Sequence, residues 1–312
     1  MAVGWQSGSG TVADMTETVV EKVTFDADGV TLAGHLHLPA TAGRGLPAVV
    51  VAGAWTSVKE QMAGLYARRL AERGFAALAF DFTGYGESGG EPRDVESPSL
   101  KAGDLRHAVA YLSSLDRVAP ARIGALGICA GGAFAAVAAA DDPRIASLAL
   151  VAPGLQDGEL MRLALGGEEA FAARLAAGQR ARAHYEQTGE VEYVPGVSET
   201  DSTAAMFGPY AYYLDPARGA IPQWGNRWAT MAWAEWLTFE PQQAADRIKA
   251  PVLIVHSESA GIPVGARRFA DRLTGARELV WLEGRNQFDF YDTEPTVTES
   301  VDNVARHLHA TL

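Results

Sequence analysis

Residues 127–131 (Gly-Ile-Cys-Ala-Gly) place a cysteine between two glycines, where an apolar run at 122–126 gives way to small residues at 132–137. This strand–turn–helix pattern is typical of a nucleophile elbow, here with a thiol in the usual place of a serine hydroxyl. The turn is strained, and glycine avoids collisions with the adjoining strand and helix. A helix N-terminus also favours the thiolate. We therefore predict that Cys129 is a nucleophile rather than a packed structural cysteine.

The segments around this turn alternate between strand and helix patterns. Val19–Phe25 and Thr31–Leu38, on either side of Asp28-Gly29, predict a β-hairpin. Further strands are predicted at 47–52, 75–82, 122–128, 145–151, 251–256 and 278–282, and helices at 59–73, 99–115, 130–140, 264–273 and 297–312. This alternation indicates βαβ units and a mostly parallel sheet.

One long segment, residues 155–247, shows no strand pattern and interrupts the alternation. It contains a helical stretch at Glu168–Gln187, then a loop, then an aromatic-rich region. We interpret it as a helical lid inserted over the carboxyl ends of the strands, with some aromatic side chains lining a substrate site and the rest forming its own core. The predicted organisation is a flexible leader at 1–15, a core at 16–154 and 248–312, and the lid.

Composition restricts the classes of function. The chain has 312 residues with a formal net charge of -12 and no basic cluster, which argues against nucleic acid or an anionic membrane as a partner. Its single cysteine excludes an internal disulfide and fits a reducing cytoplasm. The start of the chain lacks the apolar stretch of a signal peptide. We expect a cytoplasmic protein, and the sequence leaves a homodimer open.

Several loops, in this order and spacing, resemble the α/β-hydrolase superfamily, and in particular its dienelactone-hydrolase-related, polyketide-transferase-like branch. These are the elbow, Ala-Gly-Ala-Trp at 52–55, Val-Lys-Glu-Gln at 58–61, Asp-Phe-Thr-Gly-Tyr-Gly-Glu-Ser-Gly-Gly at 81–90, and Phe-Asp-Phe-Tyr-Asp at 288–292. The resemblance covers nearly the whole chain. It implies an α/β fold with a mostly parallel, eight-stranded sheet flanked by helices and an inserted lid.

The resemblance also implies an oxyanion hole, which stabilises the negative oxygen formed when a carbonyl is attacked. Its donors would be the backbone amides of Ala130 and Trp55, with Ala54 as the weaker choice for the second. Backbone amides do not depend on side-chain identity. Lys59 and Glu60 are interpreted as a solvated helix start rather than as part of a site.

The chain departs from the family pattern at the general base and at the acid that orients this base. Gln287 stands where the family places its histidine, and an amide has no useful proton affinity near neutral pH. Ala260 stands where an aspartate is expected, although Glu258 lies two residues earlier. Among the histidines, His256 at the end of a predicted strand is the best substitute base, and His184 in the lid is a weaker one.

Three functions remain open from the sequence. The favoured one is an enzyme that acts on an ester, thioester or lactone through Cys129, with a degenerate triad that favours acyl transfer or cyclisation over hydrolysis. The alternatives are a non-hydrolytic cyclase or lyase that uses only the pocket and the oxyanion hole, and a binding protein without catalysis. The aromatic lid suggests an apolar or aromatic small molecule, with no cofactor or metal. The residues predicted to contact this substrate are Ala54, Tyr85, Trp228 and Trp233.

Overall fold

A computed structural model describes residues 17–41 and 43–312 of the chain. The leader predicted at 1–15 lies outside the described residues. Within the described ranges, no helix combines the length and the apolar character needed to cross a membrane.

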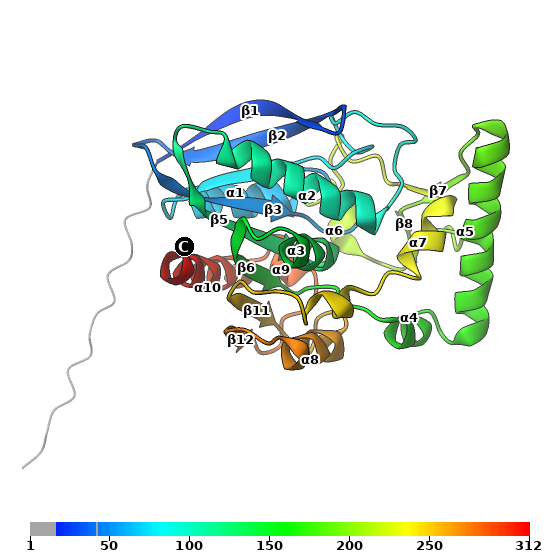
Figure 1. Cartoon of the computed structure of the whole chain (residues 1–312). Coiled ribbons are helices and arrows are strands. Elements are labelled where there is room, and N and C mark those ends of the chain that lie inside the picture. The colour runs from blue at the N-terminus through cyan, green and yellow to red at the C-terminus, as the bar shows by residue number, and fades with distance from the viewer. Residues whose placement is uncertain (1–16, 42) are drawn as a thin grey trace, which may run out of the picture.

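An eight-stranded sheet forms the centre of the molecule (Figure 1). Its strand order is β1-β2-β4-β3-β5-β6-β11-β12. The strands are β1 (Thr18–Ala27), β2 (Val30–Pro39), β3 (Leu46–Ala52), β4 (Ala76–Phe80), β5 (Val118–Ile128), β6 (Ile145–Val151), β11 (Val252–His256) and β12 (Arg277–Trp281). β1 and β2 pair as the predicted antiparallel hairpin, β2 and β4 are also antiparallel, and β4 to β12 are parallel. The predicted fold class is confirmed.

Helices cover both faces of this sheet because its central strands are apolar on both faces. Along β3, Val49 and Val51 face one hydrophobic cluster, while Ala48 and Val50 face the other. One face carries α1 (Met62–Ala71) and α10 (Thr296–Thr311), and the other carries α2 (Pro98–Ser113), α3 (Ala130–Asp141) and α8 (Pro263–Arg272). The short α9 (Asp289–Asp292) precedes α10.

The segment between β6 and β11 stands beside the carboxyl ends of the parallel strands, where α5 marks the outer edge of the molecule (Figure 1). The prediction of no strands there was wrong in detail, because two short ladders form. They are β7 (Tyr193–Pro195) with β10 (Arg227–Ala229), and β8 (Val197–Ser198) with β9 (Met206–Phe207). The helices are α4 (Gly158–Ala164), α5 (Glu168–Thr188), α6 (Ala211–Leu214), α7 (Trp233–Trp236), and the 3-10 turns η1 (Thr230–Ala232) and η2 (Pro241–Ala244).

Candidate active site

The turn between β5 and α3 holds Cys129 in a strained conformation, with a φ of 55°. Its amide donates to the Val151 carbonyl at 3.1 Å, and its carbonyl accepts from Gly132 at 2.9 Å and Gly154 at 2.8 Å. A Cβ on Gly131 would lie 2.4 Å from the Ala52 carbonyl oxygen, so only glycine fits there. The strained backbone therefore has the geometry expected of a nucleophile elbow.

The Cys129 sulfur has a phenol and two backbone amides as its polar neighbours. The Tyr291 hydroxyl and the amides of Ala130 and Trp55 lie close enough to lower the thiol pKa by hydrogen bonding. Burial acts more strongly in the opposite direction and raises the pKa of Cys129. We expected the helix N-terminus to favour the thiolate, but burial has the larger effect and raises the thiol pKa although the amides of Ala130 and Trp55 lower it.

The loop after β3 brings the Trp55 amide to the sulfur. The next residue, Thr56, has a φ of 57° and its amide donates to Oε2 of Glu96 at 3.0 Å. The indole of Trp224 donates to the Thr56 carbonyl at 3.1 Å. These two hydrogen bonds hold the backbone N–H and C=O of Thr56. They thereby fix the neighbouring Trp55 amide before any substrate binds, as an oxyanion hole requires.

Glu96 belongs to a buried polar cluster behind this loop. Its Oε2 also accepts from the Tyr85 hydroxyl at 3.0 Å, and its Oε1 accepts from Lys101 Nζ at 2.7 Å. Lys101 Nζ lies 4.1 Å from the centroid of the Tyr85 ring. The prediction that Tyr85 contacts substrate was wrong, because Tyr85 is buried in this cluster.

Gln287 is separated from the Cys129 sulfur by the side chain of Tyr291. Its Nε2 donates to the Ala152 carbonyl at 3.1 Å and lies 3.4 Å from the Tyr291 hydroxyl, while its Oε1 accepts from the Gly261 amide at 2.8 Å. Gln287 therefore links the loop after β11 to Tyr291, which in turn reaches the thiol. In this position an amide can orient the phenol but cannot remove its proton.

The alternative acids and bases lie elsewhere. Glu258 is 59% exposed and paired with Arg267, so its predicted role was wrong. His256 is fully buried, with Nδ1 against Ser257 and its ring stacked on Trp281, so it was also wrongly assigned. Burial lowers its pKa. His184 lies 3.6 Å from Glu190 on the exposed side of α5.

A cavity of about 500 Å³ opens beside the elbow. Its wall contains Trp55, Cys129, Ala130, Gly154, Gln156, Met161, Ala164, Leu165, Arg174, Ala205, Met206, Phe207, Tyr210, Trp233, Trp236 and Ile262. Trp233 lines it, but Trp228 packs behind Trp55 with ring centroids 4.2 Å apart. Ala54 is likewise buried away from the wall. The predictions that Trp228 and Ala54 contact substrate were therefore wrong. All seven histidines belong to the described residues, and none lies on this wall.

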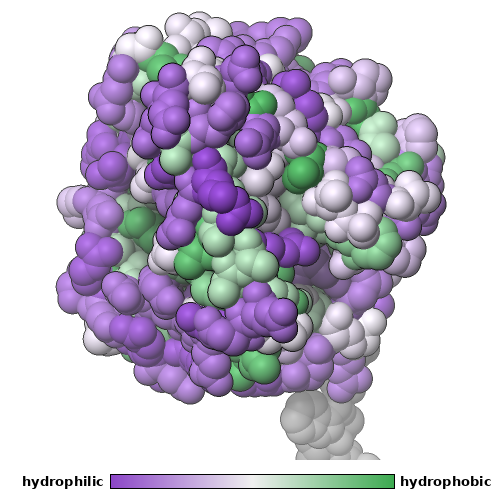
Figure 2. Space-filling view, turned by 90° about the vertical axis from the view of Figure 1, so that its right-hand side faces the viewer, coloured by the Kyte–Doolittle hydropathy of each residue, from purple (hydrophilic) through white to green (hydrophobic). Residues whose placement is uncertain are grey.

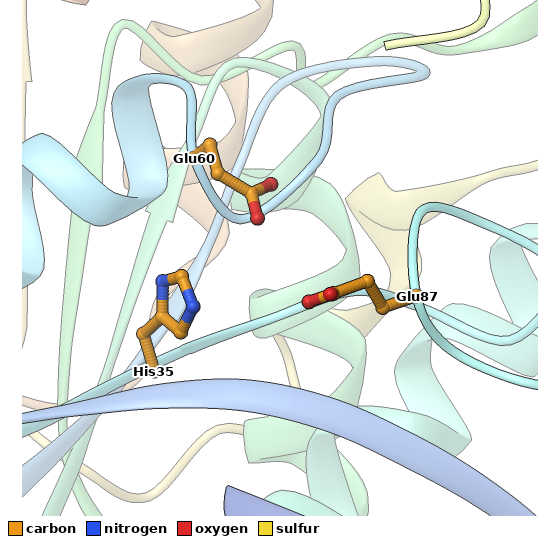
Figure 3. A group of neighbouring side chains, drawn as sticks. All are labelled: His35, Glu60 and Glu87. Atoms are coloured by element: carbon orange, nitrogen blue, oxygen red, sulfur yellow. The ribbon is translucent and has the colours of Figure 1, made fainter. Parts of the chain in front are cut away.

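Three other side chains, His35, Glu60 and Glu87, could offer ligand atoms to a metal, since these atoms lie within 4.8 Å of one another (Figure 3). The ammonium group of Lys59 already offsets the negative charge of these carboxylates. Its Nζ is 2.8 Å from Glu60, 2.6 Å from Glu87 and 2.7 Å from Asp81. Burial would lower the pKa of Lys59, but these hydrogen bonds raise it. The cluster is thus an ion-pair network, and the expected solvated helix start was wrong for Lys59.

The predicted site did not include three polar residues that lie near Cys129 or on its cavity: Tyr291, Gln156 and Arg174. Tyr291 stands in the family-like motif at 288–292, but sequence gives no sign that its hydroxyl reaches the thiol. Gln156 and Arg174 both line the cavity, the first from the segment after β6 and the second from α5. Only the folded segment between β6 and β11 brings them to one cavity.

The serine aminopeptidase, S33, family matches residues 49–284, a range that runs from β3 through the elbow to the loop before α9. This chain belongs to that family of α/β-hydrolases. The match includes both loops that supply the amides beside Cys129, and the predicted superfamily is confirmed.

Similar proteins agree with this assignment. An uncharacterized protein of Pseudomonas aeruginosa, PA2218, is 35% identical over 87% of this chain and 76% of its own length. Its crystal structure has a TM-score of 0.82 and covers 99% of each chain. The polyketide transferase grgF of a Penicillium species is 28% identical over 96% of this chain and 99% of its own. Its crystal structure has a TM-score of 0.75, with 94% of this chain and 99% of that chain covered.

A second polyketide transferase, claH of Penicillium crustosum, is 27% identical over 88% of this chain and 92% of its own. The protein is therefore an enzyme of hydrolase or acyltransferase type, with polyketide-transferase-like relatives. Its family is named for serine enzymes, whereas this chain carries a cysteine at the elbow.

Proposed function

We propose that this enzyme transfers acyl groups from a thioester, ester or lactone through Cys129. The observation that carries the proposal is the placement of the thiol on the wall of an apolar cavity with the Ala130 and Trp55 amides beside it. An acyl carbonyl bound next to the sulfur would have its oxygen between these two donors. The aromatic and aliphatic wall supports an apolar or aromatic small molecule as substrate.

A thioester donor fits this site particularly well because the exchange needs no external base. The sulfur of Cys129 bonds to the acyl carbon, and the bond from that carbon to the leaving sulfur breaks. The thiol proton leaves Cys129 and ends on the departing thiolate, so charge and atoms balance. A second nucleophile, on another substrate or on the acyl chain itself, then takes the acyl group and releases the Cys129 thiol.

Water is a poor second nucleophile in this site. Its activation needs a general base, which typically contributes about 10²–10⁴-fold. Tyr291, whose phenol pKa burial raises well above its ordinary value, holds its proton near neutral pH. The names of the polyketide transferase relatives support transfer over hydrolysis.

A non-covalent reaction is the second candidate, and the raised pKa of Cys129 favours it. A neutral thiol beside two amides leaves the oxyanion hole free to stabilise an enolate or alkoxide during cyclisation or elimination. In that case Cys129 would shape the site without forming a bond.

The two candidates differ in their response to Cys129→Ala. The test supplies hexanoyl N-acetylcysteamine thioester together with an excess of an amine or thiol acceptor, and quantifies hexanoic acid and transferred product. We expect transferred product to exceed acid, and Cys129→Ala to abolish both. Unchanged turnover in Cys129→Ala would exclude covalent transfer, and acid as the main product would contradict the preference for transfer.

A further inference from the structure

The cavity beside Cys129 is mostly apolar, yet its wall carries hydrogen-bond donors that the described residues leave unused or only partly used. Among them are the guanidinium of Arg174, the side-chain amide of Gln156 and the indole N–H of Trp55. Figure 2 shows the face that carries α5, where hydrophilic residues dominate and hydrophobic residues gather in small groups. An apolar wall with a few donors is typical of a site that orients a ligand by one polar group.

Arg174 has no anionic partner within residues 17–41 and 43–312. Its Nη1 donates to the Ala205 carbonyl at 3.2 Å, and its guanidinium carbon lies 4.9 Å from the Trp233 ring centroid. Burial lowers the pKa of Arg174, and no carboxylate offsets that effect. A guanidinium has five N–H donors, so most of them remain available for a ligand.

Helix packing sets the position of this guanidinium. A Cβ on Gly178 would lie 2.5 Å from the Ala234 amide and 2.8 Å from the Trp233 Cβ, so glycine lets α5 pack directly on α7. Residues four apart share one face of a helix, which brings Arg174 over the Trp233 ring. Its place on the cavity wall is therefore built by the close approach of two helices.

Gln156 supplies an independent observation. The residue is 1% exposed, and its Nε2 has no partner among the residues that the structure describes. A buried donor without a partner destabilises the free protein. A ligand oxygen in the cavity would remove this destabilisation.

We propose that this cavity binds a substrate carrying an oxyanion, either a carboxylate or a phosphate ester, which pairs with Arg174 while Gln156 donates to an oxygen of the same molecule. The inference rests on the proposed function in one respect, namely that the bound molecule is the acyl donor. The planar guanidinium suits the two oxygens of such a group, and its stacking on Trp233 leaves its edge free. The substrate is then an apolar acyl compound with one anionic end.

Two matched pairs of compounds test the proposal and locate the charge. Adipoyl and hexanoyl N-acetylcysteamine thioesters differ by a carboxylate on the acyl side. Hexanoyl pantetheine 4′-phosphate and hexanoyl pantetheine differ by a phosphate on the leaving side. Calorimetric binding to Cys129→Ala, which cannot be acylated there, measures affinity without reaction. We expect the charged member of one pair to bind about 10-fold or more tightly than its neutral match.

Substitutions then assign the effect. Arg174→Met keeps an apolar stem on Trp233 and should abolish the preference, while Arg174→Lys should keep part of it. Arg180→Met, at an exposed position of the same helix, should change nothing. Equal affinities within both pairs, no binding by any compound, or a preference that survives Arg174→Met would overturn the proposal. If the preference holds but Cys129 never acquires an acyl group, covalent transfer fails and the oxyanion site stands.

Discussion

A phenol hydroxyl and two backbone amides surround the Cys129 sulfur, where a serine hydrolase would place an imidazole. Gln287, which the resemblance predicts at the family's histidine position, contacts Tyr291 and Gly261, so its amide holds the phenol in place. The sequence predicts that the usual base is missing here. It did not show that Tyr291 would be the neighbour of the thiol, because α9 and the turn between β5 and α3 are remote in the sequence and only the fold brings them together.

Tyr291→Phe should make the thiol less acidic. Removal of the hydroxyl takes away a hydrogen bond that lowers the pKa of Cys129. The effect of burial is then opposed less, and the pKa of the thiol rises further. Loss of a neutral hydrogen bond is worth about 0.5–1.5 kcal/mol, which corresponds to a roughly 2- to 13-fold drop in iodoacetamide alkylation below the pKa. Alkylation rates measured by intact mass between pH 7 and 10 report it.

The matched control is Tyr66→Phe, which removes another buried hydroxyl, one that donates to the Phe290 carbonyl at 2.8 Å. It should leave the alkylation profile unchanged. An unaltered profile in Tyr291→Phe would show that its hydroxyl does not act on the sulfur.

Gln287→His should introduce ester hydrolysis. The resemblance predicts that this position corresponds to the family's base, and such a base typically contributes about 10²–10⁴-fold. Aryl-ester turnover measures the gain, with Gln287→Met as the variant of similar length that lacks a base. Equal turnover in the two variants would mean that position 287 cannot deliver a base to the reaction.

At the scale of elements, the loop after β3 depends on residues that are remote in the sequence. Glu96 holds the Thr56 amide, and Lys59 binds Asp81 and Glu87 from the next loop. The strands and most helices were predictable because their hydrophobic patterns are local. The burial of Lys59 was not, because its carboxylate partners are assembled only by the sheet.

Removal of one charge from the Glu96–Lys101 pair should destabilise the fold more than removal of both. Glu96→Gln leaves Lys101 buried without a counter-ion, which costs about 3–5 kcal/mol. The double variant Glu96→Gln with Lys101→Met should recover most of that loss and keep an acceptor for Thr56. Urea unfolding of the single and double variants measures this, and equal stabilities would contradict the role of the pair.

At the scale of the whole molecule, eight strands and two helical layers place the loops after β3, β5 and β6 at one edge of the sheet. This arrangement was predictable because strand–helix alternation constrains topology. The interior of the segment at 155–247 was not. Trp233 reached the cavity and Trp228 did not, and only the packing of α5 and α7 determines which ring faces inward.

The stability of the molecule should fall in mild acid because a partly buried histidine is kept neutral. Burial lowers the pKa of His37 from 6.5 to about 4, so the unfolded chain binds a proton that the folded chain does not between those values. The contribution of neutral His37 to the free energy of unfolding is fully present above pH 6.5. It is lost as the pH falls toward 4, and the free energy of unfolding then decreases by at most about 1.4 kcal/mol per pH unit.

The variant His37→Gln should lack this part of the slope. Thermal or urea unfolding of both proteins from pH 4 to 7 gives the comparison, since other titrating groups contribute equally to each. Parallel stability curves would contradict the assignment to His37.

Intact-protein mass spectrometry after incubation with hexanoyl N-acetylcysteamine thioester tests covalent transfer through Cys129 most directly. We expect a mass increase of one hexanoyl group in the wild type, mapped to Cys129 and absent in Cys129→Ala. We also expect this adduct to persist in buffer and to be discharged when a thiol or amine acceptor is added. A wild-type protein that turns over the thioester without any adduct, at a rate that Cys129→Ala retains, would contradict covalent transfer.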